Sequence, residues 1–471
     1  MAESRKIAGI VLAAGKGTRM KSDTPKALMP LLGLPLTAHV LRAMETAGIE
    51  PIVVVIGHRA EEVRAALGER YRYALQAEQL GTGHACLQAL PELPPEVQTV
   101  VVAPGDSPLI THEAFQAMLT LHQNTQADAT LATAVLEDPT GYGRILRDGH
   151  GRVVGIVEEK DASPEQKAIR EVCTSFYCFE VSVLREMLPR LSNQNAQGEY
   201  YLTDVIGIIA QAGGKVATWQ SPDPALLMGV NNRWELAQAA QALRMRILKH
   251  LALEGVTIVD PATTYIEPTV EVGHDTVIEP NTHLKGATRI GSRCTLGPDL
   301  VLQDTQVGDE CHLFRSHIVG AQIESGVSVG PFAHIRPGTV LKQGVRVGDF
   351  VEIKNTQVGE GTKVLHLTYL GDAIVGQECN IGAGTITCNY DGQRKHQTVI
   401  GNRVFVGSHA TLIAPVTIHD DAYIAAASPI TDDVPSEALA IARCRQTNRE
   451  GWVRRKRESI NAQGKEGATN E

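Results

Sequence analysis

The stretch IESGVSVGPFAHIRPGTVLKQGVRVGDFVEI, residues 323–353, decides the fold of the C-terminal half of this chain. An aliphatic residue returns at every sixth position, at Ile323, Val329, Ile335, Leu341, Val347 and Ile353. The same spacing holds at Ile266, Val272, Ile278, Leu284, Ile290, Leu296 and Leu302, and at Ile400, Val406, Leu412, Ile418, Ile424 and Ile430. A period of six fits neither an α-helix nor a simple alternating strand. It predicts a parallel β-helix of hexapeptide repeats, which we expect to be left-handed, with one aliphatic side chain per short strand pointing inward.

Interruptions of this period mark places where chemistry is expected. The spacing breaks near Asp304–Val307, Lys354–Val358 and Asn389–Gln397. Breaks in a solenoid are usually loops that leave one face, and binding sites are often built on loops. We therefore expect a surface loop at each of these breaks.

The N-terminal half has a different pattern, in which strand-like and helix-like stretches alternate. Strands are predicted at Ile7–Ala13, Ile52–Ile56 and Val100–Ala103, and helices at Ala60–Leu67, Glu113–His122 and Ser182–Leu191. This alternation predicts a Rossmann-like α/β domain with a mostly parallel sheet and ligands at the carboxyl ends of its strands. We place this domain at residues 1–231, a connector helix at 232–254, the β-helix at 255–435, and a C-terminal segment with a disordered tail at 436–471.

The composition narrows the class of protein. A chain of 471 residues is expected to form two or three domains, and a net charge of −9 argues against bulk binding to nucleic acid. The eight cysteines show no zinc-site spacing, and no stretch reaches the length of a membrane span or resembles a secretory signal. We therefore expect a cytoplasmic enzyme that acts on small molecules.

The first predicted strand runs into a glycine-rich loop with two cations, Gly15-Lys16-Gly17-Thr18-Arg19. Its glycines let backbone N–H groups approach phosphate oxygens, while Lys16 and Arg19 add positive charge. The spacing is that of neither a Walker A motif nor GxGxxG. A phosphate-binding loop is the prediction, and an ordinary glycine-rich turn is the alternative.

Motifs further along the chain place this loop in a family. They are Pro25-Lys26, Gln76-Ala77-Glu78-Gln79-Leu80-Gly81-Thr82-Gly83, Gly105-Asp106-Ser107-Pro108-Leu109, Gly141-Tyr142-Gly143-Arg144 and Gly229-Val230-Asn231-Asn232-Arg233. In order and spacing the chain resembles the bifunctional N-acetylglucosamine-1-phosphate uridylyltransferase/glucosamine-1-phosphate acetyltransferases, from Ile10 to Trp452. The resemblance implies synthesis of UDP-N-acetylglucosamine, with UTP and acetyl-CoA as co-substrates and Mg²⁺ as the cofactor.

For uridylyl transfer, the resemblance implies Lys26 and Arg19 as catalytic cations and Asp106 with Asn231 as metal ligands. Asn232 is a candidate N-cap of the connector helix, and the sequence leaves open which of these two asparagines meets the metal. The residues implied to bind nucleotide and sugar are Leu12, Ala13, Gly15, Lys16, Lys26, Gln76, Gly81, Thr82, Gly143, Glu158, Cys173 and Asn231.

Three positions depart from the usual family pattern. Cys173-Thr174-Ser175 stands in place of Asn-Thr-Gly, Pro104 stands where Tyr is frequent, and Leu365 replaces a small residue before His366. Cysteine forms weak hydrogen bonds, so Cys173 puts the sugar preference in question. The cations and Asp106 are intact, and the expected reaction type is unchanged.

For acetyl transfer, the resemblance implies that His366 is the base that takes a proton from the amine, a task suited to the pKa range of histidine. A surface corner histidine is the alternative. Arg336, Lys354 and Lys395 are implied to bind the sugar phosphate. The other implied binding residues are Tyr369, Asn380, Asn389 and Tyr390 for the sugar, and Ala383, Ser408, Ala426 and Arg443 for acetyl-CoA.

Assembly and two competing hypotheses complete the expectations. By resemblance alone we expect a homotrimer whose acetyl-transfer sites lie between subunits. A single-activity sugar nucleotidylyltransferase with a regulatory β-helix is the main alternative, and a non-catalytic scaffold is a further one. His366, Lys354, Tyr369 and Asn389 argue against the single-activity alternative, and the scaffold alternative predicts that alanine at Asp106 and at His366 leaves catalysis unchanged.

Overall fold

Apolar runs of the N-terminal half form the strands of an α/β sheet in the computed structural model, which describes residues 6–466. The strands are β1 (Ile7–Leu12), β2 (Pro30–Leu31), β3 (Leu34–Pro35), β4 (Ile52–Ile56), β5 (Arg72–Leu75), β6 (Thr99–Pro104), β7 (Ala129–Val135), β8 (Gly143–Arg147), β9 (Val153–Val157), β10 (Glu171–Glu180) and β11 (Val216–Gln220). The main sheet runs in the order β11, β7, β10, β6, β1, β4, β5, with β8 joined through β10 and β9 through β8, whereas β2 and β3 pair with each other in a separate two-stranded sheet. Pairing is parallel around β1 and antiparallel at β10, as expected of a mostly parallel sheet.

The helices of this half are α1 (Leu36–Thr46), α2 (Ala60–Leu67), α3 (Thr82–Ala89), α4 (His112–Thr125), α5 (Pro164–Lys167), α6 (Val181–Met187), α7 (Asp204–Gln211) and α8 (Arg233–Leu253). Four of them, α2, α4, α6 and α8, fall on predicted stretches with small changes at their ends, whereas α1, α3, α5 and α7 were not predicted. The helix predicted at Ser182–Leu191 is shorter, because a 3-10 turn at Leu188–Arg190 replaces its end. Pro189 lies in that turn, and a proline disfavours continuation of an α-helix.

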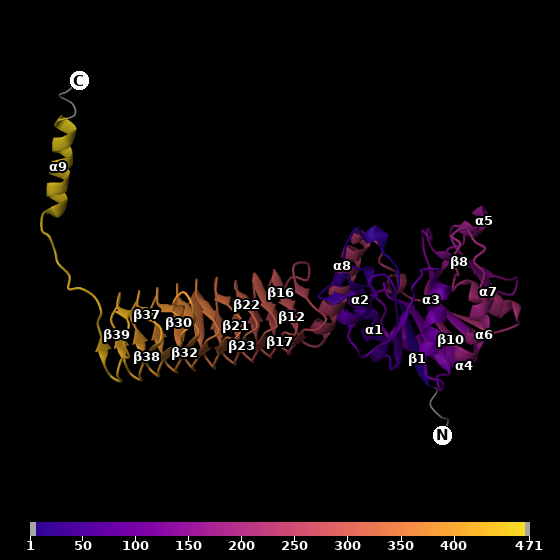
Figure 1. The fold of residues 1–471 in the computed structure, drawn as a ribbon, viewed down its shortest axis with the longest axis horizontal. Coiled ribbons are helices and arrows are strands. Elements are labelled where there is room, and N and C mark those ends of the chain that lie inside the picture. Colours follow the sequence, from indigo (N-terminus) through magenta and orange to yellow (C-terminus); the bar gives the residue numbers. More distant parts are fainter. Residues whose placement is uncertain (1–5, 467–471) are drawn as a thin grey trace. The chain divides into compact units, whose positions relative to one another are not determined.

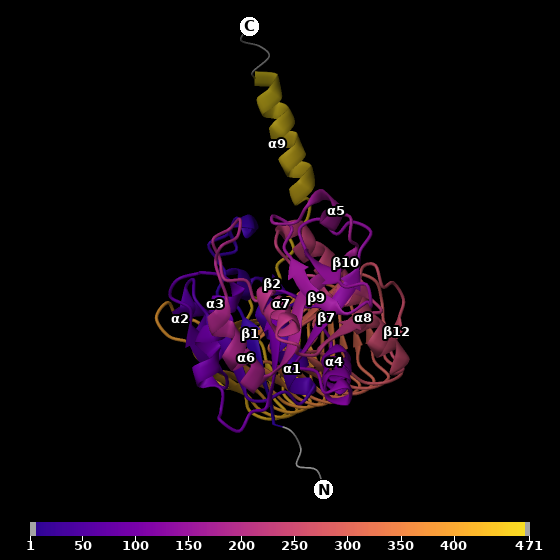
Figure 2. The same cartoon turned by 90° about the vertical axis from the view of Figure 1, so that its right-hand side faces the viewer.

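Helices cover both faces of the sheet, because successive strand residues point to opposite sides. Val53 and Val55 of β4 pack with Cys86 of α3 on one face, whereas Val54 packs with Leu41 of α1 and Phe115 of α4 on the other. Figure 2 faces this unit and shows α6 and α7 beside each other. β1 and β6 are parallel neighbours, so their carboxyl ends lie at the same edge of the sheet, between the two helix layers.

Contacts divide the chain into two compact units, Met1–His250 with Ile266–Pro268, and Leu251–Tyr265 with Thr269–Glu471. The boundary falls near the end of α8. Ala239 and Leu243 of this helix pack with Met20 and Leu36, so most of α8 is part of the first unit.

Parallel strands of the C-terminal half stack into three sheets that form the walls of a prism (Figure 1). The first wall contains β12 (Thr257–Ile258), β15 (Val277–Ile278), β18 (Thr295–Leu296), β21 (His312–Leu313), β24 (Ser328–Val329), β27 (Arg346–Asp349), β30 (Lys363–His366), β33 (Asn380–Ile381), β36 (Phe405–Val406), β39 (Tyr423–Ile424) and β41 (Leu439–Ala440). The second contains β13 (Tyr265–Ile266), β16 (Thr282–Lys285), β19 (Leu300–Gln303), β22 (His317–Val319), β25 (His334–Ile335), β28 (Glu352–Lys354), β31 (Tyr369–Gly371), β34 (Ile386–Cys388), β37 (Thr411–Ile413) and β40 (Pro429–Ile430). The third contains β14 (Glu271–Val272), β17 (Arg289–Ile290), β20 (Gln306–Val307), β23 (Gln322–Ile323), β26 (Val340–Leu341), β29 (Gln357–Val358), β32 (Ala373–Val375), β35 (Thr398–Ile400) and β38 (Val416–Ile418).

The aliphatic residues at every sixth position fill this prism. All of those named from the sequence are buried except Val272, which is partly exposed. The predicted fold class, a Rossmann-like unit followed by a left-handed β-helix of hexapeptide repeats, is confirmed.

Two of the predicted loops are shortened coils instead. A full coil contains three hexapeptides, and this is the spacing between the paired residues Glu271 and Arg289. The next pair, Arg289 and Gln306, is separated by one residue less than a full coil. The pairing of Val340 with Gln357, across the second break, falls short by the same amount. A corner can lose one residue without leaving the wall, so the loops expected near Asp304–Val307 and Lys354–Val358 are corrected to tighter corners. The third break is a loop, closed by an antiparallel bridge between Tyr390 and Lys395.

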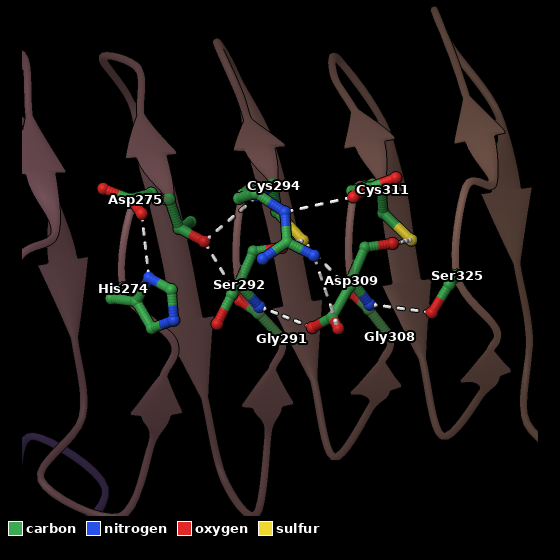
Figure 3. A network of polar contacts seen from close by, with 12 residues as sticks. His274, Asp275, Gly291, Ser292, Cys294, Gly308, Asp309, Cys311 and Ser325 are labelled. Carbon is green, nitrogen blue, oxygen red and sulfur yellow. Dashed lines mark hydrogen bonds and ion pairs between the residues drawn. The ribbon is translucent and has the colours of Figure 1, made fainter.

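Side chains hold the corners of neighbouring coils together (Figure 3). The N–H of Ser292 donates to Asp309 Oδ1 at 2.8 Å, and the N–H of Asp309 donates to Ser325 Oγ at 3.0 Å. Cys294 and Cys311 lie buried in successive coils, and each thiol donates to a carbonyl oxygen of the following coil at 3.2 Å. Both thiols are free, so they fill these corners as small side chains.

The C-terminal segment differs from the expected disorder over part of its length. Trp452–Glu466 form α9, and residues 467–471 lie outside the described part of the chain. The run contains good helix formers, including several arginines and glutamates, which favours a helix without tertiary packing. Across residues 6–466, no helix is both long enough and apolar enough to span a bilayer.

Two candidate active sites

The N-terminal unit has a cleft of about 600 Å³ at the carboxyl ends of β1 and β6. Most of the residues predicted to bind the nucleotide line it, namely Leu12, Ala13, Gly15, Lys16, Arg19, Lys26, Gln76, Gly81, Thr82, Asp106, Glu158 and Asn231. Gly143 and Cys173 line an adjoining cavity of about 670 Å³ that shares Arg19, Asp106, Glu158 and Asn231 with the cleft. The structure therefore brings every predicted residue of this site together.

Lys26 lies at the centre of the polar contacts in this cleft. Its Nζ forms an ion pair with Asp106, and it also donates to Asn231 Oδ1 at 2.9 Å. Arg19 donates to the same Oδ1 at 2.9 Å. Two cations thus converge on the end of β6, where they can neutralise a phosphate chain.

Close packing of the glycine-rich loop positions Lys26. Gly17 has a φ of 61°, and a Cβ added there would lie 2.5 Å from the Cβ of Lys26. Glycine is the residue that adopts this left-handed conformation without cost, and here it also leaves room for the lysine.

The two asparagines before α8 take different positions. Asn232 Oδ1 accepts hydrogen bonds from the N–H groups of Trp234 and Glu235, both at 2.9 Å, as an N-cap does. Asn231 Oδ1 instead faces Lys26 and Arg19.

The oxygens of Asp106 and Asn231 suit a Mg²⁺ ion. Both are hard ligands, and both contact the single Nζ atom of Lys26, so they converge on one point. Within residues 6–466 no group of three or more His, Cys, Asp or Glu side chains is placed to hold a metal. An ion here would take its remaining ligands from substrate phosphates and water, which is usual for Mg²⁺.

A partly buried carboxyl group, that of Glu158, lies between the cleft and the adjoining cavity. Thr203 Oγ1 donates to Glu158 Oε1 at 2.8 Å, and burial raises the pKa of Glu158. The Cys173 thiol lies 3.2 Å from the hydroxyl oxygen of Tyr177, and burial raises its pKa to about 12. Burial and the raised pKa favour a neutral thiol that packs in the cavity wall.

An ion pair between the buried Arg144 and the partly exposed Glu159 holds the neighbouring loop of residues 141–143. Arg144 is 1% exposed, donates to the carbonyl oxygen of Tyr142, and pairs with Glu159 at 2.7 Å. Glu159 in turn accepts from the N–H of Gly141 at 3.2 Å. The pair thus fixes both sides of Gly143, which lines the adjoining cavity.

In the C-terminal unit, His366 lies at the end of β30 and begins a row along one edge of the prism. Lys363 pairs with Asn380, Asn380 with Phe405, and Phe405 with Tyr423. Because these strand residues are in register, the residues three positions after them also lie in a row along the prism. We call this row, which consists of His366, Ala383, Ser408 and Ala426, the His366 row. Arg443 lies exposed after the last strand of this wall, and the row itself is open to solvent at His366, Ser408 and Ala426.

An acidic residue of the preceding coil orients the histidine ring. Asp349 pairs in register with His366, and His366 Nδ1 lies 2.8 Å from Asp349 Oδ1. The hydrogen bond from His366 lowers the pKa of Asp349, which stays a carboxylate. Nδ1 therefore carries the donated proton, and Nε2 is free to accept one.

The predicted cations of this unit gather on the second wall, next to the loop of residues 389–397. Arg336 donates to Glu352 at 2.7 Å, and the ammonium of Lys395, followed by Arg336, lowers the pKa of Lys354. Ile335 pairs with Ile353, which places Arg336 and Lys354 at corresponding positions of successive coils, and neighbouring cations of this kind can bind an anion.

Polar residues surround these cations. A Cβ added to Gly371 would meet the Tyr369 hydroxyl at 2.3 Å and Asn389 Nδ2 at 2.8 Å, so these two side chains lie over the glycine. Asn389 donates to Asp372 at 2.5 Å. Tyr390 points outward, 61% exposed, with its hydroxyl donating to Gly392, and Asn380 lies on the first wall near the His366 row.

Sequence reasoning missed the acidic partners Asp349, Asp372 and Glu159, together with Thr203. Asp349 precedes His366, and Asp372 precedes Asn389, by the length of one shortened coil. A search one coil before each polar residue would therefore have found both. No sequence signal marks Glu159 or Thr203, which approach their partners through the fold of the sheet.

The fold and the two sites define a class of transferase with a nucleotide-binding unit followed by a hexapeptide prism. Residues 9–195 match the model of the MobA-like NTP transferase domain, and residues 318–428 match that of the GMPPB C-terminal domain. The chain is 50% identical to the bifunctional protein GlmU of Carboxydothermus hydrogenoformans, over 95% of this chain and 100% of that protein. It is 49% identical to that of Geobacillus sp., over 95% and 97%, and 48% identical to that of Brevibacillus brevis, over 94% and 96%. The chain therefore belongs to the GlmU family of bifunctional proteins, which confirms the resemblance inferred from its motifs.

Proposed function

We propose that the chain makes UDP-N-acetylglucosamine in two group transfers, acetylation of glucosamine-1-phosphate followed by uridylyl transfer from UTP. The observation that carries this proposal is the pairing of His366 with Asp349 on a prism that also gathers Arg336, Lys354 and Lys395. A prism that only regulates needs neither a base nor an anion site. Membership of a bifunctional family favours the same conclusion over a single activity.

Uridylyl transfer would take place between Lys26, Arg19 and Asp106. An oxygen of the sugar-1-phosphate attacks the α-phosphorus of UTP, and the bond to the bridging oxygen breaks to release pyrophosphate. Both reactants are anions, so the main tasks are alignment and neutralisation of charge. Lys16, Arg19 and Lys26 supply positive charge. A Mg²⁺ ion held by Asp106 and Asn231 would add further neutralisation of the phosphates when bound.

The two ends of this cleft would bind different parts of the reactants. Gln76, Gly81 and Thr82 lie at the end that would hold the uracil, and Leu12, Ala13 and Gly15 bring backbone groups to the nucleotide. Gly143, Glu158 and Cys173 lie at the end that would hold the sugar.

Acetyl transfer would use Nε2 of His366 as the base. It takes a proton from the ammonium of glucosamine-1-phosphate, and the free amine attacks the thioester carbonyl carbon of acetyl-CoA. The carbon–sulfur bond then breaks, the attacking nitrogen loses its second proton to become the amide nitrogen, and the departing thiolate takes up a proton so that CoA leaves as a thiol. Asp349 keeps Nδ1 protonated and directs Nε2 outward.

Glucosamine-1-phosphate and acetyl-CoA would be bound mainly by residues of different walls of the prism. Arg336, Lys354 and Lys395 bind the sugar phosphate, and Tyr369, Asn380, Asn389 and Tyr390 surround the sugar. Ala383, Ser408 and Ala426 of the His366 row, with Arg443 beyond it, line the path of acetyl-CoA. The small side chains of the row leave space for an extended ligand.

The assembly would be a cytoplasmic homotrimer, with this edge of the prism facing another copy. Phe332, Phe350 and Leu367 occupy successive coils beside His366 and are 55%, 58% and 59% exposed. The rings of Phe332 and Phe350 stack with centroids 5.5 Å apart. An exposed apolar ladder of this kind is expected to be covered by another surface. Sedimentation equilibrium should give three times the chain mass.

Mass analysis of the products from each set of substrates tests the proposal. Glucosamine-1-phosphate with acetyl-CoA should give N-acetylglucosamine-1-phosphate, and that product with UTP should give UDP-N-acetylglucosamine and pyrophosphate. Absence of the first product with presence of the second would leave the single-activity alternative.

A further inference from the structure

The amide of Gln76 is held from two directions, which fixes the atom that it presents to the nucleotide cleft. Gln76 is 3% exposed, and its Nε2 lies 3.0 Å from the carbonyl oxygen of Gly81 and 3.1 Å from Nδ1 of His84. A carbonyl oxygen only accepts hydrogen bonds. The amide atom beside Gly81 must therefore be the NH₂ group, whichever way the amide is first assigned.

His84 completes this arrangement as an acceptor. One N–H of the Gln76 amide donates to Gly81, and the second can donate to His84 only if Nδ1 carries no proton. The proton of the neutral ring then lies on Nε2, which is 3.2 Å from the amide of Gln88 one turn later on α3. The amide oxygen of Gln88 accepts the proton on Nε2 when the amide is oriented with its oxygen toward the ring. Gly81, Gln76, His84 and Gln88 thus form a consistent chain of hydrogen bonds.

The oxygen of the Gln76 amide is left for a ligand. In the part of the chain that the structure describes, Oε1 has no hydrogen-bond partner. It does not belong to the fully buried polar atoms without a partner, so a ligand can reach it. Since Gln76 lines the cleft, Oε1 meets the ligand there as an acceptor.

We propose that His84 is a positioning residue for base selection, because it locks Gln76 with Oε1 toward the base edge. The inference rests on the proposed uridylyl transfer. An acceptor at this place favours uracil, whose N3 carries a proton, over cytosine, whose N3 carries a lone pair. Two facing acceptors would leave a buried group unsatisfied, which disfavours the wrong base by about tenfold or more.

The test compares kcat/KM for UTP and CTP at a fixed concentration of N-acetylglucosamine-1-phosphate. His84→Ala should lower the preference for UTP by about tenfold, mainly through KM for UTP. His84→Asn should retain most of the preference, because Asn Oδ1 can accept near the position of Nδ1. His84→Lys should lose it, because an ammonium group only donates. Acetyl transfer should be unchanged in all of these variants.

The outcomes separate this inference from the proposed function. An unchanged UTP to CTP ratio in the Ala and Lys variants would overturn the role of His84, as would equal losses in Asn and Ala, which indicate packing alone. Should His84→Ala fail to fold, the Asn and Lys variants carry the same comparison. A wild-type enzyme that releases no pyrophosphate from UTP and sugar phosphate would instead refute the proposed function.

Discussion

Replacement of Gly17 by alanine should disable uridylyl transfer far more than it destabilises the protein. At a φ of 61° a residue with a Cβ is strained, and the cost is about 1–2 kcal/mol. The new Cβ would also lie 2.5 Å from the Cβ of Lys26, where ordinary contact begins near 3.4 Å. Lys26 must then move by about 1 Å, and a shift of that size in a reacting group lowers a rate by about a hundredfold. The ion pair with Asp106 and the bond to Asn231 would shift with it.

The assay measures pyrophosphate release and thiol release on the same preparation, with thermal melting to follow stability. Gly48→Ala is the matched control, since Gly48 has a φ of 77° and nothing lies within 4 Å of the added Cβ. Both variants should melt at similarly lowered temperatures, and both should keep acetyl transfer. Only Gly17→Ala should lose uridylyl transfer. The reasoning is refuted if Gly17→Ala retains near wild-type pyrophosphate release, or if Gly48→Ala loses as much.

Three further predictions concern other parts of the two sites. His366→Ala should reduce thiol release to background and leave pyrophosphate release unchanged, since the base serves one reaction only; loss of both would show that the two sites are not independent. Arg144→Lys should raise KM for the sugar phosphate several-fold and lower stability by about 1–3 kcal/mol, because a lysine cannot hold Glu159 and Tyr142 together; an unchanged KM for the sugar phosphate alongside lower stability would limit the pair to a structural role. Glu158→Gln should gain thermal stability relative to wild type as pH rises from 5 to 8, by melting at each pH, because a carboxyl group whose pKa is raised by burial loses stability as it ionises; a constant difference would exclude that cause.

The sequence predicted the path of the β-helix well because one physical requirement repeats along it. Each short wall needs one inward aliphatic residue, so Ile323, Val329 and Ile335 locate successive strands directly. The same simplicity hid the shortened coils near Asp304 and Lys354. A corner that loses one residue shifts the spacing just as a small loop does, and only the strand pairing separates the two.

Residues predicted from short motifs lie close together in the structure. Gly15–Arg19, Lys26 and Asp106 come from such motifs, and all line one cleft. The partners that orient His366 and Arg144 are not found in short motifs. Asp349 reaches His366 through the length of a coil, and Glu159 reaches Arg144 across a folded sheet. The Asp349 contact follows from the coil length once the β-helix is recognised, whereas the Glu159 contact depends on three-dimensional register, which local spacing does not contain.

Because the coils of the prism stack regularly, corresponding residues along its edge lie at equal intervals. Successive strands in a sheet are about 4.8 Å apart, so three coils separate His366 from Ala426 by about 14 Å. Each solenoid coil contacts its immediate neighbours, which makes whole-coil insertion or removal a tolerated change. Adding one coil between His366 and Ala426 would move the far end by a single step and leave the imidazole and its aspartate untouched. The length of the His366 row and the environment of its histidine are therefore separable properties of this fold, one set by the number of coils and the other by a single corner.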